Sequence, residues 1–182
     1  MLQQALDFKA ENDALYELLK PLSDADFERK TLFKDWTIND VMQHLHYFNY
    51  AAHLSLDDED GILKLLADLR AAGEKGEEMV PYTDRMLDGV RGQALLKLWH
   101  DYYENMIGDY EGVDPKKRLK WAGPDMSVLS SVTARLMETW SHAQAIYDVL
   151  GTVRQDRDHI KNVAVIGNNT FGWTFINRGE EV

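Results

Sequence analysis

The stretch VLSSVTARLMETWSHAQAIYDVLG, residues 128–151, has the residue spacing of a long packed helix. Its apolar side chains recur every three or four positions, at Leu129, Val132, Leu136, Ala143, Tyr147 and Leu150. Ser127 before the stretch is a typical helix N-cap, and Gly151 is a typical stop signal. We therefore predict a largely buried helix over residues 128–150.

One face of this helix carries a carboxylate and an imidazole. A helix turns by about 100° per residue, so Glu138 and His142 project from the same face, one turn apart. A carboxylate on a mostly covered helix needs compensation, which a metal, the nearby Arg135 or a hydrogen-bond network would supply. The simpler alternative is a buried Glu138–Arg135 or Glu138–His142 pair without any ligand.

The rest of the chain shows the same helical periodicity, and alternating β-branched runs are scarce. We predict four or five long helices, at about residues 2–20, 38–56 (capped by Thr37), 92–111, 128–150 and 157–177. A short helix is expected over 62–73, and a further helical turn after Pro81. No repeat or linker divides the sequence, so we predict an all-α fold in one domain, residues 1–182.

Composition excludes several classes of function. Lys and Arg number 20 against 31 Asp and Glu, and the net charge of -11 opposes binding to nucleic acid or to an anionic membrane. The chain has no cysteine, so a reactive thiol would have to come from outside. It shows no signal peptide and no apolar run of about 20 residues, and we therefore expect a cytoplasmic protein.

The second helix offers a third ligand. Its apolar stripe consists of Ile38, Val41, Leu45, Phe48, Ala52 and Leu56. His44 lies at the edge of this stripe and faces inward. The same projection places His46 and His53 on the solvent side, and His100 at the border of the stripe on the next long helix. An inward-facing histidine can also be an ordinary hydrogen-bonded core residue, which is the alternative for His44.

Two imidazoles and one carboxylate, with an open fourth position, form the ligand set of many catalytic zinc sites. The same set suits iron, nickel or manganese. His44, Glu138 and His142 are therefore the candidate ligands for a divalent metal. The loop KWAGPDMS (120–127), which precedes the ligand helix, is expected to border the open end of the site through Trp121.

Two segments resemble a known family. DWTINDVMQHL (35–45) resembles the W-T-x-x-D-x-x-x-H-L signature of the DinB-like superfamily, specifically the N-terminal domain of mycothiol-dependent maleylpyruvate isomerase. GPDMSVLSSVTARLMETWSHAQAIYDVLG (123–151) resembles the corresponding R-x-x-E-x-x-x-H-x-x-D helix, and is most similar to an uncharacterised metal-binding subfamily. The resemblance implies an up-down-down-up four-helix bundle, with a divalent metal held by His44, Glu138 and His142, and zinc is expected in preference to nickel or iron.

The resemblance also implies a reaction with an external low-molecular-weight thiol and a small-molecule substrate. In several members the metal lowers the pKa of the thiol, and the thiolate attacks an electrophile in S-transfer or cis–trans isomerisation. The position of Arg135, one turn before Glu138 on nearly the same helix face, independently suggests that it orients Glu138 or binds an anionic substrate group. The alternative is an ordinary structural ion pair. The related isomerases continue into a C-terminal domain, whereas this sequence ends at GWTFINRGEEV. We therefore expect either a complete single-domain protein, as some thiol transferases of the superfamily are, or a chain that lacks a substrate-recognising half.

Two alternative functions would give the same residues different roles. A metal-dependent hydrolase would have the same ligands and would activate water instead of a thiol. A non-catalytic helical-bundle interaction module, forming a homodimer through exposed aromatic side chains, would use the polar cluster only for stability. A catalytic metal keeps an exchangeable position, whereas a structural metal is coordinatively closed.

Overall fold

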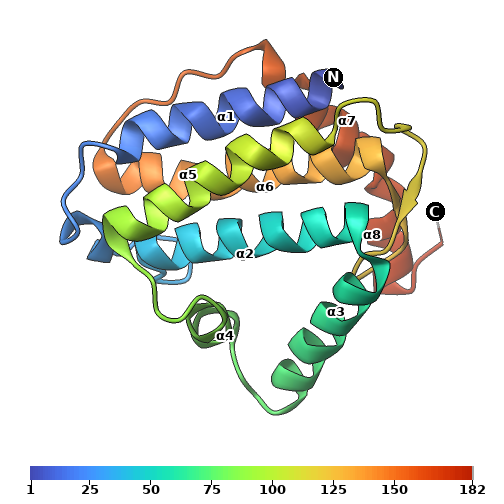
Figure 1. The fold of residues 1–182 in the computed structure, drawn as a ribbon, viewed down its shortest axis with the longest axis horizontal. Coiled ribbons are helices and arrows are strands. Elements are labelled where there is room, and N and C mark those ends of the chain that lie inside the picture. Colours follow the sequence, from blue (N-terminus) through green and yellow to red (C-terminus); the bar gives the residue numbers. More distant parts are fainter. Residues whose placement is uncertain (182) are drawn as a thin grey trace.

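Four long helices form the body of the protein in the computed structural model, which describes residues 1–181 (Figure 1). They are α1 (Gln3–Leu19), α2 (Ile38–Asp57), α5 (Gly92–Asp109) and α6 (Val128–Leu150). α1 and α6 run in one direction, and α2 and α5 run in the other. Each helix packs against two others, so that α1 and α2 each lie beside both α5 and α6. The predicted all-α, up-down-down-up bundle is confirmed.

Shorter elements surround this bundle. They are η1 (Asp26–Glu28), α3 (Glu59–Glu74), α4 (Met79–Met86), β1 (Arg118–Leu119), β2 (Met126–Ser127), η2 (Asp158–Ile160), α7 (Lys161–Asn169) and α8 (Phe171–Arg178). α3 and α4 pack against α2, and the strands pair antiparallel with Leu119 opposite Met126. None of the helices within residues 1–181 has the length and hydrophobicity of a membrane span.

The ends of the two ligand-bearing helices are fixed by side-chain caps. The Thr37 hydroxyl accepts a hydrogen bond from the Asp40 amide at 3.1 Å, and the Asp40 carboxylate accepts one from the Thr37 amide at 2.8 Å. Ser127 caps α6 in the same way, accepting from the Ser130 amide at 3.1 Å. Gly151 ends α6 with φ of 67°, a left-handed conformation that costs glycine little. These caps confirm the predicted helix starts and stop.

The prediction of one continuous last helix over residues 157–177 is wrong. The chain forms η2, α7 and α8 instead, and α7 ends at Asn169 with Thr170 as its C-cap. The Thr170 hydroxyl donates to the Ile166 carbonyl at 2.8 Å, and its backbone N–H donates to the same carbonyl at 2.9 Å. Side chains of this type compete with regular helix bonding, which explains the break.

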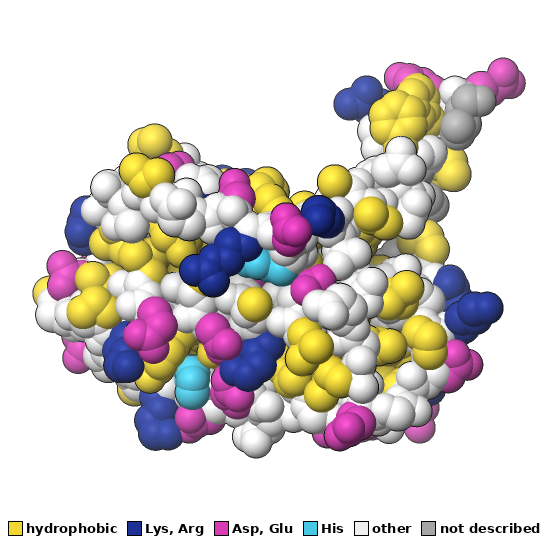
Figure 2. Space-filling model, turned by 90° about the horizontal axis from the view of Figure 1, so that it is seen from above, with side chains coloured by type: hydrophobic (Ala, Val, Ile, Leu, Met, Phe, Trp, Pro, Cys, Tyr) yellow, Lys and Arg dark blue, Asp and Glu magenta, His cyan; other side chains and the backbone are white. Residues whose placement is uncertain are grey.

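Polar side chains of α1 attach the C-terminal segment to the bundle. Asn162 donates to the Asp7 carboxylate at 2.7 Å, and His159 contacts the Glu11 carboxylate at 2.6 Å. Arg154 forms an ion pair with the same carboxylate. α8 lies beyond these contacts, in the part of the surface that projects from the body in Figure 2, and its Phe171 is 62% exposed.

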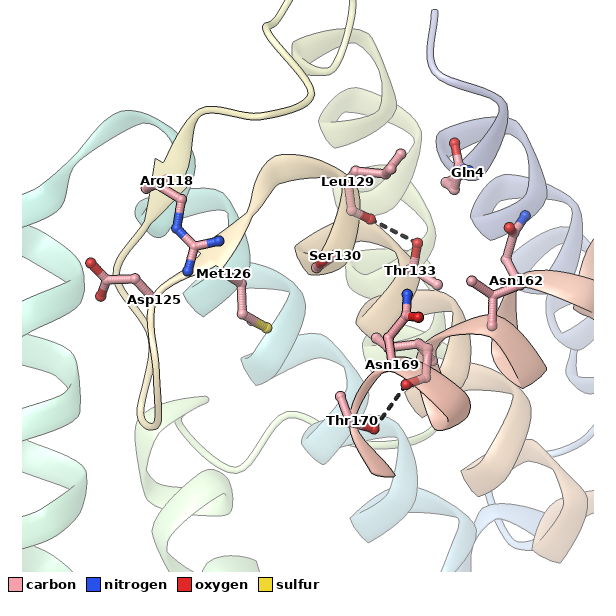
Figure 3. Close-up of a pocket in the computed structure, with 12 residues that line it drawn as sticks. Gln4, Arg118, Asp125, Met126, Leu129, Ser130, Thr133, Asn162, Asn169 and Thr170 are labelled. Carbon is pink, nitrogen blue, oxygen red and sulfur yellow. Dashed lines mark hydrogen bonds between the residues drawn. The ribbon is translucent and has the colours of Figure 1, made fainter. Parts of the chain in front are cut away.

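A shallow groove lies where α7 meets the start of α6 (Figure 3). The groove has a volume of about 230 Å³ and is bordered by the β1–β2 hairpin and the first turn of α1. Leu129 lines it and is 36% exposed, although it belongs to the predicted apolar stripe of α6. Farther along that stripe, Val132, Leu136 and Ala143 are fully buried.

The sequence places His46 on the solvent side of α2, and the structure contradicts this. His46 is only 5% exposed, and its ring lies edge-on to Tyr102 of α5 with ring centroids 5.2 Å apart. α2 is covered by α5 and α6 on one side and by α3 and α4 on another, so most of its circumference is buried. Burial lowers the pKa of His46 to about 4.

We expect the His46→Phe substitution to make the fold less sensitive to acid. Burial lowers the pKa of His46 to about 4 in the folded chain, whereas the pKa in the unfolded chain has the ordinary value of 6.5. Only the unfolded state therefore takes up this proton as the pH falls below 6.5. The residue should cost the wild type about 2 to 3 kcal/mol of unfolding free energy between about pH 7 and about pH 4.5.

Urea unfolding of both proteins at both pH values measures this contribution. The difference in unfolding free energy between the wild type and His46→Phe should change by about 2 to 3 kcal/mol between about pH 7 and about pH 4.5. An equal difference at the two pH values would show that His46 does not titrate in this way.

Candidate metal centre

The structure brings together the three residues that the sequence singles out as metal ligands. α2 supplies His44, and the facing helix α6 supplies Glu138 and His142 from successive turns. Both imidazoles direct Nε2 at the same carboxylate oxygen, Glu138 Oε2, at 3.4 Å from His44 and 3.3 Å from His142. The two imidazole ring centroids are 4.6 Å apart. The three side chains therefore converge on one point between the helices.

These separations fit a metal better than they fit direct hydrogen bonds. A good N–H···O bond spans about 2.7 to 3.2 Å, so both contacts are long for hydrogen bonds. Metal bonds of about 2.0 to 2.1 Å in a tetrahedral site place neighbouring ligand atoms about 3.3 to 3.4 Å apart. One donor atom from each residue lies within 4.8 Å of the other two. The residues present thus match a two-histidine, one-carboxylate site in both donor type and spacing.

The protonation states favour metal binding. Burial lowers the pKa of His44, and this effect outweighs the opposing hydrogen bond to Glu138. Burial alone would raise the pKa of Glu138, but the hydrogen bonds from His142 and His44 and the charge of Arg135 hold it well below its usual range. At neutral pH, His44 is therefore neutral and Glu138 is ionised, which are the forms that coordinate a cation.

Aromatic side chains hold the two imidazole rings. The His142 ring lies edge-on to Phe33, with centroids 5.1 Å apart, and almost parallel to Trp36 at 6.2 Å. The His44 ring is tilted against Phe48 at 4.7 Å. Packing of this kind limits ring rotation, so the Nε2 atoms keep their direction toward Glu138.

Phe33 and Trp36 come from the loop before α2. The loop is closed by a hydrogen bond from the Thr31 amide to the Trp36 carbonyl, 2.8 Å long. Lys34 and Asp35 at its tip have φ of 54° and 57°, a left-handed conformation unusual for non-glycine residues. These two aromatic residues were not among the site residues predicted from the sequence. Trp36 is the first residue of the W-T-x-x-D signature, whereas Phe33 had no signal beyond its position shortly before the helix that carries His44.

A small cavity of about 140 Å³ adjoins the three-residue cluster. Its lining consists of His44, Phe48, Trp121, Arg135 and Glu138. Trp121 lies in the loop before α6, which agrees with the expectation that this loop borders the site. Of the three cluster residues, Glu138 has the most exposed side chain, at 27%. A small molecule entering the cavity would therefore reach the carboxylate that the histidines share.

Arg135 is buried against this cavity. It is 4% exposed, and its guanidinium carbon lies 5.9 Å from the Phe48 ring centroid and 5.5 Å from that of Trp121. Nη1 is buried without a hydrogen-bond partner within the described chain. The direct Glu138–Arg135 ion pair that the sequence left open as an alternative is not formed, although the charge of Arg135 still acts on Glu138.

A second group of donor atoms lies elsewhere, where α2 and α5 end. His53 Nε2 is 3.2 Å from the Asp57 carboxylate and 3.0 Å from that of Asp109, and His53 Nδ1 is 2.8 Å from the Tyr102 hydroxyl. Both distances to the carboxylates are ordinary hydrogen-bond lengths. The two carboxylate side chains are 60% and 41% exposed. Hydrogen bonding accounts for this group without a cation.

The topology and the cluster between α2 and α6 define a DinB-like helical bundle with a histidine and carboxylate centre. Residues 8–147 match the family described as the mycothiol maleylpyruvate isomerase N-terminal domain, and the chain belongs to this family. No solved structure shows a significant match to it.

Similar proteins occur in Mycobacterium tuberculosis. Two uncharacterised proteins, one from strain CDC 1551 / Oshkosh and one from strain ATCC 25618 / H37Rv, are each 31% identical to this chain over 170 residues. The alignment covers 93% of the chain and 65% of either relative. The chain thus spans just under two thirds of the length of these relatives.

We expect the purified protein, prepared without chelator or polyhistidine tag, to bind about one equivalent of a divalent metal. The substitutions Glu138→Gln and His142→Ala should each weaken binding by more than about 100-fold, because even residues that only orient a ligand affect affinity 10- to 100-fold. Equilibrium dialysis against zinc, nickel or iron, followed by elemental mass spectrometry, measures the stoichiometry.

Two variants serve as controls for this metal measurement. His53→Ala disrupts the donor group where α2 and α5 end, and His46→Phe replaces another buried histidine of α2. Both should keep the wild-type metal content. If His53→Ala abolished binding while Glu138→Gln preserved it, the ion would have to be assigned to the other group.

Proposed function

We propose that this protein is a divalent-metal-dependent thiol transferase or isomerase, which uses an external low-molecular-weight thiol on a small electrophilic substrate. The observation that carries this proposal is the convergence of two imidazole Nε2 atoms on one oxygen of Glu138, beside a cavity that the same carboxylate lines. The description of the family, which names mycothiol, supports a thiol of that kind. The absence of cysteine is consistent with a thiol supplied from outside.

The chain's own residues would hold the metal and enclose the substrate. His44, Glu138 and His142 would bind the ion, with zinc preferred over nickel or iron. A bound divalent metal would supply the Lewis acidity that lowers the pKa of a thiol. Phe48 and Trp121 would shield the nearby space from water, and both line the cavity. We place this activity in the cytoplasm, where low-molecular-weight thiols stay reduced.

The test of this function is thiol-dependent turnover. The zinc-loaded protein should catalyse either the cis–trans isomerisation of maleylpyruvate or the S-conjugation of 1-chloro-2,4-dinitrobenzene, in both cases only when mycothiol is present. Glu138→Gln should lower kcat/KM by more than about 1,000-fold, because it removes the charge that binds the metal. Absorbance assays follow both reactions.

Other outcomes would identify the alternative functions. Hydrolysis of p-nitrophenyl acetate without any thiol, lost in Glu138→Gln, would indicate a metal-dependent hydrolase. Tight metal binding with no turnover of any of these substrates would indicate a non-catalytic bundle. Either result would overturn the thiol-dependent reaction proposed here.

A further inference from the structure

Arg135 is a buried cation with no direct counter-ion. Its side chain forms no hydrogen bond, and no ion pair shorter than 4.0 Å, with any other described residue. A buried charge without a partner is costly, and removing an unsatisfied group of this kind commonly stabilises a protein. The Phe48 and Trp121 rings attract the guanidinium weakly but cannot accept its N–H hydrogens as carboxylate oxygens do.

Arg135 lies beside the candidate metal centre, and a cation bound there would add to the uncompensated positive charge. Glu138 carries the one carboxylate among the residues that line the cavity. With a divalent cation on His44, Glu138 and His142, that negative charge would already be committed to the ion. The cation and Arg135 together would then leave the cavity with an excess of positive charge, which an anionic ligand would balance.

We propose that Arg135 binds a carboxylate group of the substrate, and that the cavity thus selects small organic acids. The guanidinium presents N–H donors in a planar fork that matches the two oxygens of a carboxylate. Phe48 and Trp121 lie beside the guanidinium and line the same cavity, so the carbon atoms of a bound acid would contact apolar rings. At about 140 Å³, the cavity admits only a short carbon skeleton.

Arg135 and Glu138 are one helical turn apart on α6, so they face the cavity together. A carboxylate on Arg135 would place the adjacent carbon atoms of the same molecule beside the cluster of His44, Glu138 and His142. This inference rests on the proposed function, because it assigns the acid to the substrate of that centre. Binding of the acid itself needs no turnover, so it can be measured separately.

Propionate, as the simplest carboxylate probe, tests the assignment. Propionate is titrated into the zinc-loaded and the metal-free protein at constant ionic strength, and binding is followed by NMR shifts of the tryptophan indole N–H groups. We expect saturable binding that is weakened at least tenfold in Arg135→Met and that is tighter in the zinc-loaded protein. Propionamide, which has the same shape without the charge, should not bind.

The matched control is Arg70→Met, which removes the same charge from an exposed position. It should bind propionate as the wild type does. Arg135→Met should keep or raise the melting temperature in the absence of propionate, because it removes an uncompensated buried charge. A marked fall in melting temperature, with propionate binding unchanged in Arg135→Lys, would instead assign Arg135 a structural role.

The remaining outcomes separate this inference from the function on which it rests. Equal propionate affinity in wild type and Arg135→Met would overturn the inference, even if thiol-dependent turnover were present. Tighter binding of phosphate than of propionate, lost in Arg135→Met, would overturn the choice of a carboxylate. Propionate binding that depends on Arg135, in a protein without thiol-dependent turnover, would support the inference and refute the proposed reaction.

Discussion

The packing of α2 against α6 is the interaction on which the rest of this structure depends. The three clustered ligand side chains lie on these two helices, which run antiparallel (Figure 1). Thr37 and Ser127 cap the first turns of the two helices and fix the residue at which each helix begins. His44 follows its cap by about two turns and Glu138 by about three. A displacement of either helix by one residue would separate the imidazole from the carboxylate.

Buried polar side chains on α2 explain how that helix is held. Asn39 donates to Glu28 at 2.9 Å and accepts from the Gly92 amide at 2.7 Å, which fixes the start of α5. Gln43 donates to Asp84 at 2.8 Å and to the Val90 carbonyl at 3.1 Å, which positions the connection after α4. Such networks specify one arrangement of helices when they are largely satisfied. α2 thus organises the bundle through polar contacts as well as through its apolar stripe.

Much of this arrangement could be predicted from local sequence signals. The helix caps, the stop at Gly151 and the two apolar stripes depend on residues close together in the chain, and they predicted the long helices and the three candidate ligands. The up-down-down-up arrangement of the helices was implied by the family resemblance. The burial of His46 could not be predicted, because it depends on Tyr102 of α5, which is far away in the sequence and lies edge-on to the His46 ring. The unpaired state of Arg135 and the packing of Phe33 on His142 likewise depend on segments far apart in sequence.

The separation of the ligands along the chain gives the site a role in holding the protein together. His44 and Glu138 are 94 positions apart, and the segment between them contains all of α3, α4 and α5. A cation bound to both would act as a reversible cross-link between distant parts of a chain that has no cysteine for a covalent one. Unfolding would release the ion, so the persistence of the folded state would follow the free metal concentration around it.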